Sequence, residues 1–166
     1  GKHQAPVQCV EYCKNYNILV SGSWDKSIKY WDVRMKDKLV GSVDTKLKVY
    51  AMSIKNEKMV VGLENRCIQY YDLRKSNHYI KEYDMPKWFG TNVSPTDKIE
   101  REICDIRDIE IFPDETGFVT TLIEGRGIVT HFDQNERDKD FQWKCHRHPK
   151  HPGKHQSDMI HEIDVY

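Results

Sequence analysis

The sequence predicts an all-β protein built from repeats of a small antiparallel sheet. Short runs rich in β-branched and aromatic residues are separated by turn residues along the chain. No window shows the sustained period of apolar residues that a helix requires. The same order of runs also recurs about every 40 residues, a spacing that indicates a repeat architecture.

The first unit contains four expected strands joined by short turns. They are placed at residues 7–12, 17–21, 27–31 and, more weakly, 38–43. A tight turn separates the second strand from the third, and Asp25 in this turn can accept a hydrogen bond from the backbone that follows it. The unit is therefore a four-stranded antiparallel meander.

Two further copies of this pattern follow. Their expected strands are 47–54, 59–63 and 67–72, then 108–112, 117–122 and 128–133. The copies agree in detail, because Trp31-Asp32-Val33-Arg34 is matched 40 residues later by Tyr71-Asp72-Leu73-Arg74. The third copy closes with Phe132-Asp133, 61 residues after Tyr71-Asp72. The excess length lies in the polar stretch 87–101, which we expect to be a surface loop insertion.

A period near 40, four strands per unit and a Trp-Asp pair ending the third strand are typical of a WD-repeat β-propeller. The first copy carries His3, Ser21, Asp25 and Trp31 where such repeats form a buried chain of hydrogen bonds. The second and third copies lose most of this set.

About three blades fit into 166 residues, whereas propellers close with roughly four to eight. We therefore expect the chain to be part of a longer propeller. The expected divisions are a blade at 1–44, a blade at 45–86, an insertion loop at 87–101, a blade at 102–147, a loop rich in His and Lys at 148–161 and the start of the next blade at 162–166.

The composition excludes several classes of function. Lys and Arg total 26 and Asp and Glu total 26, so binding to nucleic acid or to a membrane would need a local patch. There is no apolar run of about 18 residues and no secretory h-region, which favours the nucleus or the cytoplasm. The five cysteines form no CxxC pair and are expected to be thiols. No P-loop, Rossmann, GxSxG or HExxH signature is present, so we expect no enzyme.

Several stretches together resemble one family of WD-repeat proteins, the family of the mitotic checkpoint protein Bub3 and the mRNA export factor Rae1, also called Gle2. The stretches are Ala5–Cys13, Val20–Lys26, Lys48–Tyr50, Ile123–Arg126 and Lys144–Arg147. The resemblance covers Ala5 to Arg147 apart from the insertion. It implies a non-enzymatic, seven-bladed propeller without a cofactor, found in the nucleus and at kinetochores, with the cytoplasm as a further location.

The checkpoint branch of this family implies a scaffold of the spindle assembly checkpoint. Such a scaffold binds GLEBS segments, which are short peptides with paired glutamates, of the Bub checkpoint kinases, and phosphorylated MELT motifs of a kinetochore scaffold. The run Cys9–Cys13 and Tyr71–Arg74 resemble this branch. The stretch Asp25–Asp32 suits the export branch as well, which implies a nucleoporin GLEBS segment as partner and leaves room for RNA.

The resemblance assigns four residues to the binding of peptides and phosphate. Trp24 precedes the turn Asp and is expected to anchor a peptide on the propeller face. Arg107 and Arg126 match arginines that meet glutamates of the GLEBS segment. Arg126 and Lys144 match basic positions near the phosphothreonine. Asp105 and Asp108 flank Arg107 and depart from the family pattern, which weakens carboxylate capture there.

A zinc-binding module is the alternative of another class. Cysteine and histidine are zinc ligands, and the segment 145–155 contains Cys145 and several histidines. Its spacing matches no zinc-finger signature, and its prolines and glycine suit a solvated basic loop. We therefore expect no metal site.

Overall fold

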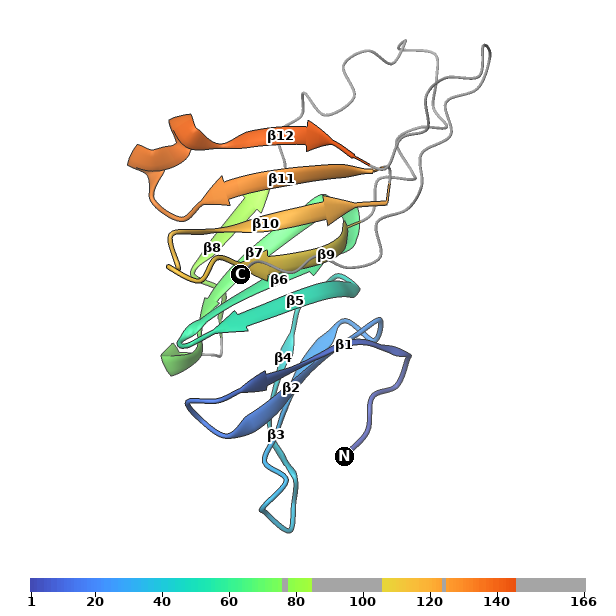
Figure 1. The fold of residues 1–166 in the computed structure, drawn as a ribbon. Coiled ribbons are helices and arrows are strands. Elements are labelled where there is room, and N and C mark those ends of the chain that lie inside the picture. The colour runs from blue at the N-terminus through green and yellow to red at the C-terminus, as the bar shows by residue number, and fades with distance from the viewer. Residues whose placement is uncertain (76–77, 85–105, 124, 146–166) are drawn as a thin grey trace, which may run out of the picture. The chain divides into compact units, whose positions relative to one another are not determined.

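The computed structural model describes residues 1–75, 78–84, 106–123 and 125–145 (Figure 1). The chain divides into two compact units, Gly1–Asp84 and Met85–Tyr166. The described residues form three four-stranded antiparallel sheets and a few short 3₁₀ turns, which confirms the predicted all-β, WD-repeat architecture. Within these residues, no helix has the length and apolar character needed to cross a bilayer. The expected insertion loop 87–101, the loop 148–161 and the start of a further blade at 162–166 lie outside the described residues.

The first sheet has its strands in the order of the sequence. They are β1 (Val7–Cys13), β2 (Ile18–Ser23), β3 (Ser27–Trp31) and β4 (Leu39–Asp44). All four lie within about two residues of the predicted positions. β-Branched and aromatic residues make up three of the five residues of β3, as expected for a pleated, half-buried strand.

The second sheet repeats the arrangement. Its strands are β5 (Val49–Lys55), β6 (Lys58–Leu63), β7 (Cys67–Asp72) and β8 (Lys81–Asp84), with the 3₁₀ turns η1 (Glu64–Arg66) and η2 (Leu73–Lys75) on either side of β7. The third sheet lies in the second unit. It contains β9 (Ile106–Ile111), β10 (Gly117–Leu122), β11 (Arg126–His131) and β12 (Phe141–Lys144), with η4 (Gln134–Lys139) before β12.

The core of the first unit lies between its two sheets. Strand β5 packs against β1 and β2, and the buried residues between them include Val20, Ile28 and Val49. Gly22 marks the closest approach, because a Cβ atom built there would lie 2.5 Å from Val49 Cγ1 and 2.7 Å from Cys9 Sγ. Glycine is therefore required at this point by the packing of one sheet on the next.

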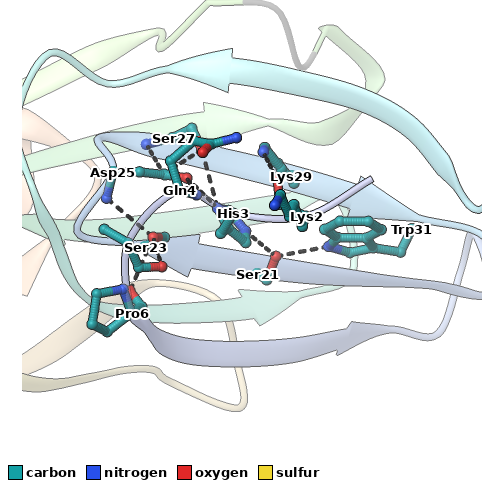
Figure 2. A network of polar contacts seen from close by, with 11 residues as sticks. Lys2, His3, Gln4, Pro6, Ser21, Ser23, Asp25, Ser27, Lys29 and Trp31 are labelled. Carbon is teal, nitrogen blue, oxygen red and sulfur yellow. Dashed lines mark hydrogen bonds and ion pairs between the residues drawn. The ribbon is translucent and has the colours of Figure 1, made fainter.

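A buried chain of hydrogen bonds ties the N-terminal segment to the first sheet, as Figure 2 shows. The Trp31 Nε1–H group donates to Ser21 Oγ at 2.7 Å, and Ser21 Oγ lies 2.7 Å from His3 Nε2. Because the Asp25 carboxylate beside Nδ1 can only accept, Nε2 of the neutral ring accepts from the Ser21 hydroxyl and His3 carries its proton on Nδ1. That proton is directed at Asp25 Oδ2, 2.9 Å away. The predicted chain from Trp31 through Ser21 and His3 to Asp25 is thus confirmed.

Asp25 is the acceptor at which this chain ends. Burial would raise the pKa of Asp25, but hydrogen bonds from the Ser27 side chain, the Gln4 backbone and His3 outweigh that effect and lower it well below the usual range. Asp25 is therefore a carboxylate in the folded chain, and protonating it weakens its hydrogen bonds with four donors, the His3 ring, the Gln4 N–H and the N–H and hydroxyl of Ser27.

We expect Gly22→Ala to lower the free energy of unfolding by about 1–3 kcal/mol, because the added methyl group forces β2 and β5 apart. Gly41→Ala is the matched control, since the nearest atom to a Cβ there is Tyr30 Cδ2 at 3.3 Å. Urea unfolding of both variants checks this. Equal losses in the two variants would contradict the close packing at Gly22.

We expect acid to destabilise the chain through Asp25. The folded pKa is lower than the unfolded value of about 3.9, so the stabilisation is complete above that pH and is lost as the pH falls towards the folded pKa. Asp25→Asn should be less stable at pH 7 and lose less stability between pH 7 and pH 3 than the unsubstituted chain. Asp37→Asn, an exposed control, should behave as the unsubstituted chain does. Parallel pH profiles for Asp25→Asn and the unsubstituted chain would overturn this assignment.

Candidate functional site

Trp24 lies in the turn between β2 and β3, and its position is fixed from both sides. Its backbone N–H donates to the carbonyl of Pro6 at 3.1 Å. The preceding Ser23 hydroxyl also donates to that carbonyl, at 2.9 Å, and accepts the N–H of Asp25 at 3.1 Å. The turn is therefore held by the same segment that carries His3, and the Trp24 side chain remains 40% exposed.

The indole of Trp24 also contacts the second sheet. The ring centroids of Trp24 and Tyr50 are 6.1 Å apart at an angle of 55°. Tyr50, the second residue of β5, was not assigned to the site by the sequence, although it lies in one of the stretches that carry the resemblance. The contact depends on how one sheet packs on the next, which no local pattern reports. Trp24 and Tyr50 together form a partly exposed aromatic pair suited to anchoring a peptide.

Three of the predicted site residues lie at one end of the third sheet. The strand register pairs Ile106 with Leu122, Leu122 with Arg126, and Arg126 with Lys144. These residues form one row across all four strands. Residues directly opposite in an antiparallel pair have Cβ atoms about 5 Å apart, so Arg126 and Lys144 present two cations side by side.

Gly125 shapes the approach to this row. It has φ 70°, its N–H donates to the Leu122 carbonyl at 3.1 Å, and its carbonyl accepts the N–H of Cys145 at 2.9 Å. The left-handed conformation suits glycine. Arg126 itself is the first residue of β11, directly after this glycine.

Arg107 lies beside the same row, at an irregular point of β9. The register shifts between Thr121 and Leu122, so Ile106 and Asp108 have direct partners and Arg107 is the extra, bulged residue. A bulge changes the direction of a side chain relative to regular pairing. The carboxylate of Asp108 accepts the N–H of Ile109 at 2.9 Å. Asp105, the other acid expected beside Arg107, lies outside the described residues.

Trp24 occupies the equivalent end of its own sheet. Both Trp24 in the first unit and the row in the second lie where odd-numbered strands begin and even-numbered strands end. In the first unit this end, which we call the Trp24 end, consists of residues 24–26, 44–48 and 64–66. Lys48 and Glu64 form an ion pair of 3.5 Å there, and a Lys46–Asp44 pair lies on the preceding loop.

The zinc alternative falls almost entirely on residues outside those described. Of the segment 145–155, only Cys145 is described, as a half-buried thiol. Among the described residues, no three histidine, cysteine, aspartate or glutamate side chains are grouped in a way that could hold a metal ion.

The repeated four-stranded sheets and the chain of hydrogen bonds through His3 define a WD-repeat protein. Residues 1–32 match the family model described as WD domain, G-beta repeat. A chain in the crystal structure of a mitotic checkpoint complex has the same fold, with a TM-score of 0.61 and 12% identity over 79% of this chain and 35% of that one.

Three relatives show which WD-repeat proteins this chain resembles. This chain is 30% identical to the mitotic checkpoint protein bub-3 of Caenorhabditis elegans over 98% of its own length, and 33% identical to the spindle assembly checkpoint protein bub3 of Schizosaccharomyces pombe over 89%. It is 32% identical to the mRNA export factor GLE2 of Chaetomium thermophilum over 87%. The chain is a WD-repeat protein that is similar to members of the Bub3 and Gle2 family. It spans about two fifths of the length of these relatives, 43%, 42% and 37% respectively.

Arg126 and Lys144 lie directly opposite each other in the third sheet, and repulsion between them should lower the free energy of unfolding. We expect Lys144→Glu to raise the free energy of unfolding by a few tenths to about 1 kcal/mol, because like charges directly opposite in a sheet are destabilising. Lys139→Glu is the control, since Lys139 pairs with Glu136 at 2.7 Å and its reversal should lower stability slightly. Thermal unfolding at low salt measures both. A loss of stability in Lys144→Glu would mean that the two cations do not repel.

Proposed function

We propose that this chain is part of a non-enzymatic scaffold of the spindle assembly checkpoint, acting in the nucleus at kinetochores. In this proposal it binds GLEBS segments of checkpoint kinases and phosphorylated MELT motifs. The observation that carries the proposal is the row at the end of the third sheet, where Arg126 and Lys144 are direct cross-strand neighbours and Arg107 lies beside them.

The chemistry of the row suits a phosphorylated or acidic peptide. A phosphothreonine carries a charge of about −1.5 to −2 and three strong acceptor oxygens. An Arg fork can grip two of these oxygens, while a neighbouring Lys neutralises the remaining charge. Binding an anion also removes the repulsion between Arg126 and Lys144, so the ligand and the site stabilise each other.

Trp24 supplies a different kind of contact. A partly exposed indole against Tyr50 offers apolar area for a peptide side chain, and its turn is held rigidly by Ser23 and Pro6. A rigid aromatic anchor loses little entropy on binding. We assign it to the GLEBS segment.

The mRNA export factor is the second candidate. The 32% identity to the GLE2 relative supports it as directly as the bub-3 similarity supports the checkpoint function. In this case the partner is a nucleoporin GLEBS segment, and phosphorylated MELT motifs are not ligands. The two functions therefore differ in their response to one phosphate group.

We expect a phosphothreonine MELT peptide to bind more than tenfold tighter than its unphosphorylated twin, a difference above about 1.4 kcal/mol. Arg126→Ala and Lys144→Ala should each remove most of that gain, because each deletes a cation of the row. Lys139→Ala, an exposed cation of the same unit, should leave it unchanged. Fluorescence anisotropy with labelled peptides provides the measurement.

Equal, weak binding of both MELT peptides would overturn the checkpoint function. A nucleoporin GLEBS peptide is then the ligand to test. Its binding, with a loss in Trp24→Ala, would support the export function.

A further inference from the structure

The turn 64–66 of the second sheet is the counterpart of the turn between β2 and β3. The last paired residues of β2 and β3 before their turn are Gly22 and Ile28. Those of β6 and β7 are Gly62 and Ile68. Two turns of equal length therefore lie 40 residues apart along the chain, both at the Trp24 end.

The loop between β4 and β5 holds these two turns together. The N–H of Thr45 in this loop donates to the carbonyl of Lys26 in the first turn at 2.9 Å. The N–H of Glu64 in the second turn donates to the carbonyl of Lys48 at 2.9 Å. Strand β5 begins directly after the loop, and its second residue is the aromatic partner of Trp24. The turn 64–66 is therefore bound to the same short loop as the turn that carries the aromatic anchor.

Two of the three arginines in the first unit are each held by an aspartate two residues earlier. Arg34 Nε and Nη2 donate to the two carboxylate oxygens of Asp32 at 2.9 and 2.7 Å. Arg74 makes the same fork on Asp72. These hydrogen bonds, together with the charge of the arginines, lower the pKa of each aspartate to about 2. Both guanidinium groups are therefore occupied by the chain itself.

The third arginine, Arg66, differs from these two. Glu64 stands two residues before it, but Glu64 Oε1 pairs with Lys48 Nζ at 3.5 Å instead. Within the described residues, the half-buried side chain of Arg66 makes no hydrogen bond and no ion pair. The other acids of the Trp24 end, Asp25 and Asp44, also bond to other side chains. Arg66 therefore has five N–H donors for which the described part of the chain supplies no acceptor.

The backbone at Arg66 is in a conformation that favours glycine. In each sheet the residue directly before the third strand is left-handed, with φ 66° at Lys26, 62° at Arg66 and 70° at Gly125. The third sheet uses the residue that adopts this conformation without steric cost. An arginine that is kept on strained backbone, with its guanidinium unpaired, fits a role in binding.

A carboxylate is the ligand that an open guanidinium selects. The planar fork of arginine matches the two oxygens of a carboxylate, and such charge-assisted bonds are stronger than neutral ones. The pair formed by Trp24 and Tyr50 offers apolar area at the same end of the unit. A peptide that carries an acidic residue close to an apolar one would satisfy both.

We propose that Arg66 binds a carboxylate of the peptide whose apolar side chain lies on Trp24 and Tyr50. The Trp24 end then selects segments in which an acidic residue lies close to an apolar one. This role is additional to the glutamate contacts expected of Arg107 and Arg126, and it rests on the peptide-binding function proposed above.

The test is anisotropy of the full chain with fluorescein-labelled GLEBS peptides of a checkpoint kinase and of a nucleoporin. Arg66→Gly should weaken binding by about fivefold, as expected for a charge-assisted contact at a half-exposed site. Lys46→Gly is the matched control, because it also removes a cation from a left-handed position of this end, with φ 65°, but one already paired with Asp44. It should change the affinity by less than about twofold.

A scan of the peptide identifies the carboxylate that is bound. Each acidic residue of the peptide is replaced in turn by its amide and measured against the unsubstituted chain and both variants. At the contacted residue the loss caused by Arg66→Gly should disappear, because the two changes remove the same contact. Every amide replacement should remain additive with Lys46→Gly.

Urea unfolding separates a loss of binding from a loss of folding. Glycine adopts the left-handed conformation without steric cost, so the urea midpoint of Arg66→Gly should stay the same or rise. A lower midpoint would mean that the Arg66 side chain supports the fold, which contradicts an open guanidinium.

The remaining outcomes separate this role from the function on which it rests. Unchanged affinity in Arg66→Gly, with affinity lost in Trp24→Ala, would overturn the role of Arg66 and leave peptide binding at this end standing. An equal loss in Arg66→Gly for every amide peptide would indicate diffuse attraction and would overturn it as well. No binding of either GLEBS peptide would overturn the proposed GLEBS function and the role of Arg66 together.

Discussion

The hydrogen-bond chain through His3 is the constraint on which the first unit and the turn that carries Trp24 depend. It joins a segment before β1 to β2 and β3, and it ends on Asp25 in the turn that carries Trp24. Each group in this chain donates a hydrogen bond to the next, from Trp31 through Ser21 and His3 to Asp25. The side chains are therefore held in a single arrangement. Trp24 lies between Ser23 and Asp25, both of which are held by this arrangement. The peptide anchor proposed at Trp24 requires a turn that does not move, and the buried polar chain holds this turn in place.

The other two sheets reach the same shape by different polar contacts. In the second sheet, Tyr71 takes the place of Trp31 and its hydroxyl donates to Gln69 Oε1 at 2.7 Å, while Gln69 Nε2 donates to Glu82 at 2.9 Å. Burial raises the pKa of Tyr71, which therefore stays a neutral donor. In the third sheet, both the N–H and the ring Nδ1 of His131 contact Asp140 Oδ1 at 2.8 Å. The repeat is thus preserved in backbone pairing while the stabilising bonds move to other positions.

Local patterns in the sequence predicted most of the strands because those strands alternate and recur. The matched runs ending in Asp32 and Asp72 fold into matching Asp–Arg forks, as their 40-residue spacing suggests. The outer strands β8 and β12 were not predicted individually, since Lys-Glu-Tyr-Asp and Phe-Gln-Trp-Lys are only four residues long and lack a clear apolar face. Because β12 was not predicted, the sequence could not show that Arg126 pairs with Lys144. The contact of Trp24 with Tyr50 could not be predicted from the sequence either, because it arises from the packing of separate sheets.

The two ends of the first unit also differ in the backbone conformations that their turns require. At the end opposite Trp24, the left-handed positions are taken by Asn17 and Asn56, residues that tolerate this conformation well. At the Trp24 end they include Lys26, Lys46 and Arg66, where a long side chain costs roughly 1 kcal/mol more than glycine would. The charged side chains of Lys26, Lys46 and Arg66 therefore lie on strained backbone beside Trp24, whereas asparagines take the left-handed positions at the opposite end. Strain of this kind collects at binding sites, and its presence around Trp24 supports the assignment of the peptide-binding surface to that end.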